Sequence, residues 1–294
     1  MMNLKNYKGV LPSPEDKRDW HIDRCMDIPA GSINFPKKFK VSWLPEIRDQ
    51  LYTQSCTAFV VALIMSCIWH KLYGEDKVFS TGYSYGNRRE TEHKGEGQFP
   101  RAVAKTITEY GDVFANIWDN NLEVPKAIDV FEEDYEKICS FAKKLIKGYV
   151  RLTIHDAEEA KSFLMKYDVP LFASTKIKHI NPLGQSNALH AIACTGWDGK
   201  YFTFQNSWGK NDCPHPKIEL ENLEEIWGFI PMEKKKFTDI EETRWSAEAI
   251  QTATNDGIIE GYPDGTFAPE QPLTREQMAV IWERMKRYMA ENKE

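Results

Sequence analysis

The hydrophobic pattern of the first half of the chain indicates helices. Apolar residues run without interruption from Ala58 to Met65 and continue after Ser66, which is typical of a buried helix. A second pattern ends at Gly111, and glycine commonly follows the last helical residue. Helices are therefore predicted over residues 56–71, from 98 or 100 to 110, and over 156–166.

Strand patterns appear later in the chain. Residues 170–175, 190–197 and 201–205 are short apolar runs with β-branched and aromatic residues, and Asp198-Gly199 favours a tight hairpin between the last two. Helices first and strands afterwards predict an α+β fold with an antiparallel sheet.

The last 58 residues have a different pattern. A helix is indicated around residues 245–250, followed by a loop rich in Gly, Pro and Asp. Thr274 and Gln277 then have the spacing of a capping box at the start of a second helix. We expect a helical hairpin whose second helix packs through apolar residues at helical spacing, namely Met278, Ile281, Trp282, Met285 and Met289.

The charge distribution supports a division near residue 236. Lys and Arg number 38 and Asp and Glu 44 in the whole chain, and residues 237–294 hold 6 and 12 of them, which leaves 32 of each before the boundary. The Lys234 to Lys236 run is the largest basic cluster, so a nucleic-acid partner is not expected.

Membrane insertion and secretion are also not expected from the sequence. The apolar run that begins at Ala58 is shorter than the roughly 18 to 20 residues of a membrane-spanning helix. The first eight residues lack the apolar core of a secretory signal. The six cysteines form no CxxC pair, and the histidines share no metal-ligand spacing, so we expect no metal and no cofactor.

Cys56 is the cysteine with chemistry around it. It lies at the predicted first turn of a helix, where free backbone N–H groups and the helix dipole stabilise a thiolate. This position predicts a lowered thiol pKa and a nucleophile.

Three segments together resemble the papain-like cysteine peptidases. Residues 47–59 resemble their nucleophile segment, with Gln50 six residues before Cys56. Residues 189–192, around His190, resemble the histidine motif, and residues 205–209 match the Asn-Ser-Trp-Gly motif with Asn206. His190 and Asn206 follow Cys56 by 134 and 150 residues, close to the spacing expected for such a triad.

This resemblance implies a role for each residue. Cys56 is the nucleophile, His190 the base, and Asn206 the amide that orients the ring. Gln50 and the Cys56 backbone N–H form the oxyanion hole. Trp208 shields the Asn–His hydrogen bond, and Gly97 and Gln98 lie at the glycine-pair segment that binds substrate backbone.

The resemblance implies a papain-like fold with a helical part and an antiparallel β part over residues 35–233. Leu51, Thr57 and Gln98 depart from the family pattern, and Thr53 stands where a partner cysteine is usual. Residues 1–34 form an N-terminal extension that we expect to pack on the body; the alternative is a short blocking segment across the cleft.

Residues 237–290 resemble one S-layer homology (SLH) repeat, through Phe237-Thr238-Asp239-Ile240, the Gly257 to Pro269 loop and Leu273-Thr274-Arg275-Glu276. In that family the Thr-Arg segment binds anionic cell-wall polysaccharide, which makes Arg275 the wall-ligand candidate. A single repeat could also bind weakly, assemble by oligomerisation or serve another partner.

Together these features predict a bacterial or phage cysteine endopeptidase with a peptide or protein substrate and a wall-binding repeat. The location follows from the repeat: the cell surface or wall, or a virion, with the cytoplasm as the alternative because no signal peptide is seen. Two other hypotheses stay open. One is an inactive papain-fold binding protein of a cell wall or phage tail, and the other keeps the chemistry on a different bond, such as a peptidoglycan stem peptide.

Overall fold

The computed structural model of the chain contains two compact units, residues 1–232 and 233–294. We call the first the body and the second the C-terminal unit. The structure describes residues 9–17, 19, 22, 34–87, 95–118, 135–181, 186–233, 237–241 and 243–291. Cys25 and the Lys234 to Lys236 boundary lie outside these residues.

The body is a mixed α+β structure with all strand pairs antiparallel. Its helices are α1 (Cys56–Tyr73), α2 (Thr81–Gly86), α3 (Pro100–Tyr110), α5 (Tyr135–Cys139), α6 (Ala157–Tyr167), α7 (Ile177–Ile180) and the short 3-10 helix η3 (Leu220–Asn222). Its strands are β1 (Lys38–Lys40), β2 (Ile146–Arg151), β3 (Leu171–Lys176), β4 (Leu189–Asp198), β5 (Tyr201–Gln205), β6 (Lys217–Ile218) and β7 (Leu223–Pro231).

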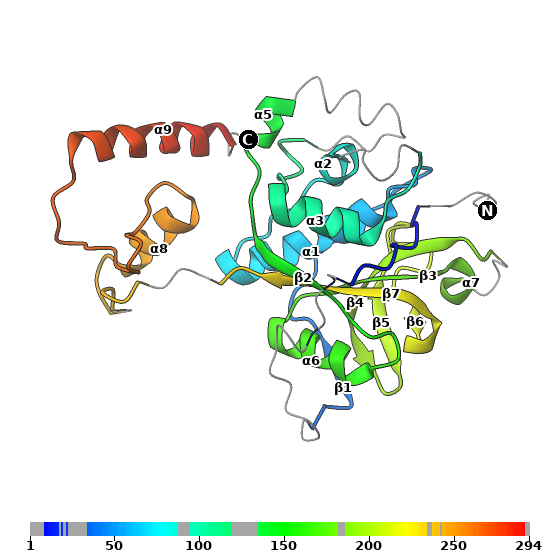
Figure 1. Ribbon diagram of the computed structural model, residues 1–294. Helices are drawn as coiled ribbons and strands as arrows, with labels where there is room; N and C mark the ends of the chain where they lie inside the picture. The colour runs from blue at the N-terminus through cyan, green and yellow to red at the C-terminus, as the bar shows by residue number, and fades with distance from the viewer. Residues whose placement is uncertain are drawn as a thin grey trace. The chain divides into compact units, whose positions relative to one another are not determined.

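One sheet organises the body. Its strands follow the order β2-β7-β3-β4-β5-β6, and β1 pairs with the far end of β4. The α1, α2 and α3 helices gather on one side of this sheet, and α6 lies on the other (Figure 1). The fold therefore has a helical part and a β part that meet along α1.

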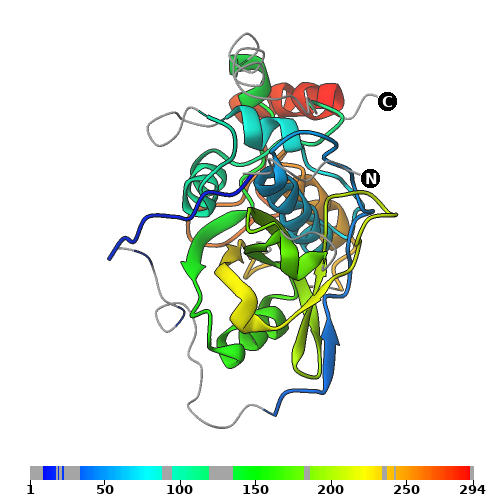
Figure 2. The same ribbon diagram turned by 90° about the vertical axis from the view of Figure 1, so that its right-hand side faces the viewer.

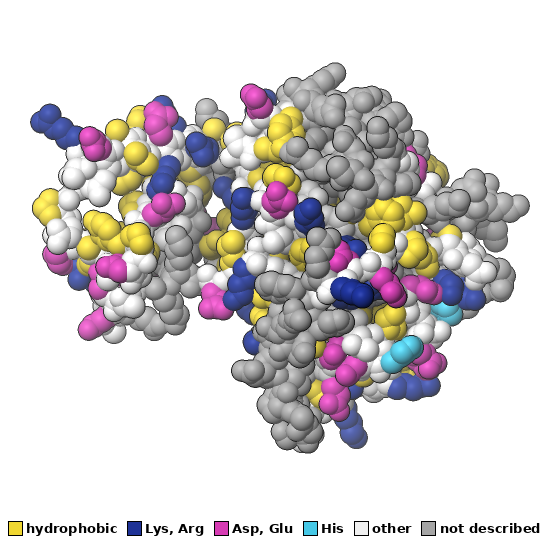
Figure 3. Space-filling model, in the orientation of Figure 1, with side chains coloured by type: hydrophobic (Ala, Val, Ile, Leu, Met, Phe, Trp, Pro, Cys, Tyr) yellow, Lys and Arg dark blue, Asp and Glu magenta, His cyan; other side chains and the backbone are white. Residues whose placement is uncertain are grey.

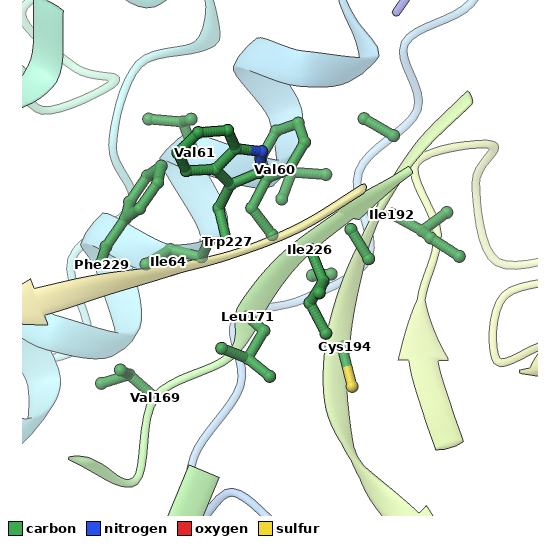
Figure 4. Packing of buried hydrophobic residues seen from close by; sticks show 14 of the residues in the cluster. Val60, Val61, Ile64, Val169, Leu171, Ile192, Cys194, Ile226, Trp227 and Phe229 are labelled. Atoms are coloured by element: carbon green, nitrogen blue, oxygen red, sulfur yellow. The ribbon is translucent and has the colours of Figure 1, made fainter. Parts of the chain in front are cut away.

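The core lies where α1 meets the sheet. Trp227 and Phe229 point from β7 toward Val60 and Val61 of α1, whereas Ile226 points to the opposite face (Figure 4). The α1 helix is long and apolar enough to cross a membrane, but 78% of it is buried inside the body. It is the central helix of a packed core, as the uninterrupted apolar run indicates.

The long elements agree with the sequence predictions. The helices predicted over 56–71, 100–110 and 156–166 are α1, α3 and α6, and the three predicted strands are β3, β4 and β5. The β4–β5 hairpin turns at Gly199, whose φ of 63° suits glycine. Strands β1, β2, β6 and β7 were not predicted.

An N-terminal segment, residues 9–17, crosses the body between α3 and the sheet. We call it the strap; it is drawn in dark blue in Figure 1 and Figure 2. Val10 of the strap is 3% exposed and belongs to the main hydrophobic core. The strap is thus packed on the body.

The C-terminal unit contains two helices, α8 (Ala247–Asn255) and α9 (Arg275–Glu291). The predicted capping box is present: Thr274 N donates to Gln277 Oε1 at 2.9 Å, and Gln277 N donates to Thr274 Oγ1 at 3.1 Å. Among its described residues, Ile250 is the one buried apolar side chain.

The expected packing of the α9 stripe is wrong for most of its length. Met278, Trp282, Met285 and Met289 are exposed, and apolar side chains lie on the surface of this unit (Figure 3). The physical reason is that a single hairpin of this size offers too little surface to cover both helices.

Candidate active site

Cys56 is the first residue of α1 and is 1% exposed. Its sulfur accepts a hydrogen bond from the backbone N–H of Ala191 at 3.4 Å. Ala191 follows His190 on β4, so the start of the helix and the middle of the sheet meet at this sulfur. The contact joins residues 135 positions apart in the chain.

The His190 ring is fixed by an amide. His190 Nε2 lies 2.8 Å from Asn206 Oδ1, and both residues are buried. The amide orientation follows from its other partners, because Ser207 N donates to Oδ1 at 2.8 Å and Asn206 Nδ2 donates to the carbonyl of Cys213 at 3.2 Å. Since Oδ1 is an acceptor, Nε2 carries the proton and Nδ1 is left as the basic nitrogen.

Trp208 covers the same pair. Its ring lies 4.5 Å from the His190 ring, centroid to centroid, at an angle of 37°. Trp208 is itself 3% exposed. The indole therefore separates the imidazole from solvent on this side.

Gln50 is held in a turn that leads into α1. Its Oε1 accepts from Ser207 Oγ at 2.7 Å, and its Nε2 donates to the carbonyl of Thr53 at 2.8 Å. The Gln50 backbone N–H donates to the carbonyl of Ser207 at 2.8 Å.

The expected lowered pKa of Cys56 is not found in this structure. Burial raises the pKa of the Cys56 thiol to about 12, although the Ala191 N–H acts in the opposite direction. Burial likewise lowers the pKa of His190 to about 4, against the effect of its hydrogen bond to Asn206. The helix start alone does not outweigh the loss of solvent, so burial favours the uncharged form of each group.

Gly97 and Gln98 form one wall of the site. Gly97 has φ 87°, which favours glycine. The Gln98 side chain is buried and tied on both sides: Thr57 Oγ1 donates to Oε1 at 2.6 Å, and Nε2 donates to the carbonyl of Ser84 at 3.0 Å. The two departures from the family pattern, Thr57 and Gln98, thus satisfy each other.

The strap lies against this wall and pairs with the backbone of Gln98. The Gln98 N–H donates to the carbonyl of Gly9 at 3.2 Å, and Leu11 N donates to the Gln98 carbonyl at 3.1 Å. A Cβ placed on Gly9 would lie 2.5 Å from Cys56 Sγ and 2.9 Å from the carbonyl oxygen of Gln54. The strap therefore covers the sulfur, at a distance that admits only glycine.

Further contacts hold the strap beyond Gln98. Ser13 N donates to Glu225 Oε1, and Ser13 Oγ accepts from Arg101 N at 3.1 Å. The Arg101 guanidinium pairs with Asp19 at 2.5 Å, and Arg151 lies 3.9 Å from the same carboxylate. Sequence motifs could not indicate these contacts, since Ser13 and Glu225 are 212 residues apart.

In the C-terminal unit Arg275 is exposed at the first position of α9. A hollow of about 460 Å³ lies nearby and is lined in part by Tyr262, Gln277 and Arg284. Arg284 pairs with Glu260 at 3.2 Å. Arg275 does not line this hollow, so the sequence candidate and the concave surface are separate features of the unit.

The body has the papain-like cysteine protease fold. The cysteine protease xylellain from Xylella fastidiosa superimposes with a TM-score of 0.64 at 18% identity, over 78% of this chain and 97% of that one. Procathepsin L 3 of Tenebrio molitor larval midgut gives 0.55 at 13% identity, over 70% and 73% of the two chains. At such identities the likeness establishes the fold alone.

Residues 236–279 match the S-layer homology domain. Cell surface glycoprotein 1 of Acetivibrio thermocellus is 47% identical over 45 residues, and the cellulosome-anchoring protein of that organism is 40% identical over 45 residues. The outer membrane protein SlpA of Deinococcus radiodurans is 44% identical over 48 residues. These matches cover 15% or 16% of this chain and 2%, 10% and 4% of the respective relatives.

Proposed function

We propose that the body hydrolyses peptide bonds with Cys56 as the nucleophile, His190 as the base and Asn206 as the residue that orients His190. The observation that carries this proposal is the 2.8 Å contact between His190 Nε2 and Asn206 Oδ1, next to a sulfur that accepts from Ala191 N. The fixed imidazole tautomer and the contact of Cys56 Sγ with the residue after His190 support this proposal, because nucleophilic catalysis by cysteine requires a base at the thiol.

Each step of this reaction has a residue to perform it. His190 Nδ1 accepts the thiol proton as sulfur attacks the substrate carbonyl carbon. The Cys56 N–H and the Gln50 side-chain amide stabilise the oxyanion. His190 then gives its proton to the leaving amine, and a thioester forms. Water, deprotonated by His190, cleaves the thioester to release the acid and the free thiol.

Cleavage of a peptide library tests the proposal. Cys56→Ala and His190→Ala should abolish turnover, and Gln50→Ala should lower it by roughly 10² to 10³, the usual effect of losing one oxyanion donor. Asn206→Ala should cost less than His190→Ala. Cys213→Ala is the matched control, since only its backbone carbonyl contacts Asn206. If a chain whose strap is displaced from Cys56 by Gly9→Val cleaves nothing, the body is a papain-fold binding protein instead.

The proposed enzyme is latent in this conformation. The strap covers Cys56 and satisfies both backbone groups of Gln98, which a substrate strand would otherwise pair with. Burial, to which the strap contributes at Cys56, favours the uncharged forms of the thiol and the imidazole. Displacing the strap would return water to the pair and move both pKa values toward ionisation.

Two substitutions test this latency. Gly9→Val places side-chain atoms against Cys56 Sγ and the Gln54 carbonyl, and Asp19→Lys repels Arg101 and Arg151. Each should speed alkylation of Cys56 by iodoacetamide at pH 7 at least tenfold. Lys17→Ala is a control within the strap that leaves these contacts in place. Equal alkylation of all four chains would show that the strap does not protect the thiol.

The second unit suggests where such an enzyme acts. Since the matched relatives are a cell-surface glycoprotein, an anchoring protein and an outer membrane protein, we propose that the SLH domain attaches the chain to an anionic wall polysaccharide at the cell surface. Arg275 offers an exposed guanidinium fork for a carboxylate.

Sedimentation with purified wall sacculi tests this attachment. Arg275→Ala should reduce pelleting, and added salt should weaken it because the contact is ionic. Arg287→Ala removes another exposed arginine of α9 and should pellet like the wild type. Sacculi stripped of their secondary polymer should bind none of these chains, including the wild type. If Arg284→Ala is defective while Arg275→Ala is not, the hollow is the site and Arg275 is not the ligand.

A further inference from the structure

Thr57 is a buried residue directly after the nucleophile, and the proposed chemistry does not use it. It is the second residue of α1. Its backbone N–H hydrogen-bonds the Cys56 thiol. Its side chain contacts a different part of the site, because Thr57 Oγ1 donates to Gln98 Oε1 at 2.6 Å. One residue therefore touches both the nucleophile and the wall of the site.

The backbone and the side chain of Gln98 have different partners. The backbone N–H and carbonyl pair with Gly9 and Leu11 of the strap, at 3.2 and 3.1 Å. The carboxamide is anchored in the body, since Oε1 accepts from Thr57 and Nε2 donates to the carbonyl of Ser84 in α2 at 3.0 Å. The backbone thus serves a bound peptide while the side chain joins α1 to α2.

The two residues before Gln98 are also held by α2. We call residues 96–98 the wall segment. Tyr85 Oη donates to Glu96 Oε2 at 2.6 Å and accepts from Gly97 N at 3.3 Å. The wall segment is therefore fastened to α2 at all three of its residues, and Thr57 joins it to the helix that carries the nucleophile.

Anchoring the side chain of Gln98 restricts its backbone. Rotation about φ and ψ is the soft motion of a residue, and it would move a carboxamide that is held at both ends. The N–H and carbonyl of Gln98 therefore keep the directions that an extended peptide needs before a peptide binds. Such preorganisation strengthens binding, because the peptide does not have to order the wall segment.

Stability alone does not require a polar pair at this place. Residues 58–61, which follow Thr57 in α1, are all apolar and buried. Replacing both partners of a buried hydrogen bond by apolar groups of the same shape can be nearly neutral. The Thr57–Gln98 bond is therefore better explained by the wall that it holds.

We propose that Thr57 is a positioning residue that holds the peptide-binding backbone of Gln98 through the Gln98 carboxamide, and so sets the affinity of the site for extended peptides. For substrates this role rests on the proposed peptidase function. For the strap it does not, because the strap binds the same backbone groups.

The activity test compares a peptide with a small ester. It uses the full chain with Gly9→Val, or with Asp19→Lys if Cys56 stays protected from alkylation. The acyl group of para-nitrophenyl acetate is too small to reach Gln98, so its hydrolysis reports on the catalytic residues. Thr57→Val should lower the ratio of kcat/KM for the peptide to kcat/KM for the ester by roughly tenfold, the order that one buried hydrogen bond supplies. The loss should appear in KM rather than in kcat.

Two variants separate positioning from packing. Thr57→Ser keeps the hydroxyl and should keep the ratio, although it loses a methyl group. Thr108→Val is the matched control, because the Thr108 hydroxyl donates within its own helix, to the carbonyl of Ala104 at 2.8 Å. An unchanged ratio in Thr57→Val, or an equal fall in Thr57→Ser, overturns the inference while leaving the peptidase function standing.

A double-mutant cycle tests whether Thr57 acts through Gln98. Gln98→Met keeps a long unbranched side chain but loses the acceptor, so it should lower the ratio by itself. Thr57→Val then has no bond left to remove, and the double variant should be no worse than the worse single variant. Additive losses would overturn the inference. Gln98→Met alone still tests the bond if Thr57→Val does not fold.

Alkylation of Cys56 tests the same bond without catalysis. Thr57→Val should loosen the strap of the otherwise wild-type chain and speed the reaction with iodoacetamide at pH 7 several-fold. The same substitution in the Gly9→Val chain, where the strap is already displaced, should not speed it. Equal alkylation of Thr57→Val and the wild type contradicts the positioning role even if peptides are cleaved. Faster alkylation in a set of chains that cleave no peptide supports that role and removes the peptidase function instead.

Discussion

Leu51 adopts a left-handed backbone conformation with φ 53°, directly after the proposed oxyanion residue Gln50. This region disfavours residues with a Cβ by roughly 1 to 2 kcal/mol. The turn persists because its neighbours fix it: Leu51 N donates to Asp49 Oδ1 at 2.8 Å, and Thr53 N donates to the Gln50 carbonyl at 3.2 Å. The strained backbone therefore lies directly beside the proposed oxyanion hole.

Leu51→Gly should therefore stabilise the chain. The side chain is 55% exposed, so little burial is lost, and relief of the strain should exceed the entropic cost of glycine by about 0.5 to 1 kcal/mol. Urea unfolding measures the gain. Tyr52→Gly, at a neighbouring position that is 78% exposed, is the control and should destabilise. A loss of stability in Leu51→Gly would show that the turn depends on the leucine.

His190 should make folding sensitive to acid. Its pKa is about 4 in the folded chain and about 6.5 when unfolded, so the unfolded chain binds the proton first. The contribution of neutral His190 to the free energy of unfolding is complete above pH 6.5. It falls by about 3 kcal/mol as the pH drops to 4. Denaturant titrations at pH 7.5, 5.5 and 4.5 measure it. His190→Gln should flatten this dependence, whereas His215→Gln should not.

The elements of the fold differ in how well sequence indicates them. The α1, α3 and α6 helices were predictable because each has a long local pattern, and α6 also begins with Asp156, which accepts from Glu158 N and Glu159 N. The β7 strand was missed although it is central. It is apolar on both faces after its second and third residues, which are glutamates, and it pairs with strands distant in sequence, so no alternation marks it.

The candidate site likewise contains residues that local sequence motifs indicate and contacts that they do not indicate. Cys56, His190, Asn206 and Gln50 lie in recognisable local motifs, so their positions could be proposed in advance. The strap contact of Ser13 with Glu225 and the Thr57–Gln98 pair depend on residues that meet only in three dimensions. The raised Cys56 pKa was missed for a related reason, because burial is a property of the folded body rather than of the helix start.

Gly228 of β7 permits the approach of α6. A Cβ at this position would lie 2.3 Å from Phe163 Cε2. Gly228→Ala should therefore cost about 1 to 3 kcal/mol, as overpacking of a core does. Thermal unfolding of Gly228→Ala, Phe163→Leu and the double variant forms a cycle. The smaller leucine should recover part of the loss, and simple additivity would mean that the ring is not the obstacle.

Buried apolar side chains and net charge are distributed unevenly between the two units of the molecule. The body holds nearly all of the buried apolar side chains among the described residues, and the C-terminal unit contributes Ile250 alone. The excess acidic charge belongs to residues 237–294. The catalytic proposal and the attachment proposal therefore rest on separate parts of the chain.

Removal of the C-terminal unit should separate the two activities. Residues 1–236 should keep the thermal midpoint of the body and its peptide cleavage, because the main core lies within residues 1–232. The fragment should lose pelleting with wall sacculi. Equal pelleting of the full chain and the fragment would contradict attachment through the SLH domain.

The strap and the sulfur that it covers belong to one covalent chain. A ligand tethered in this way acts at a fixed local concentration, commonly in the millimolar range, however dilute the protein is. In the proposed enzyme, free substrate must compete with that concentration, so dilution alone cannot start turnover. A single backbone cut after the strap would turn the tether into an ordinary dissociable peptide. Activation would then depend on protein concentration, and a released strap could inhibit neighbouring molecules where many are held on one surface.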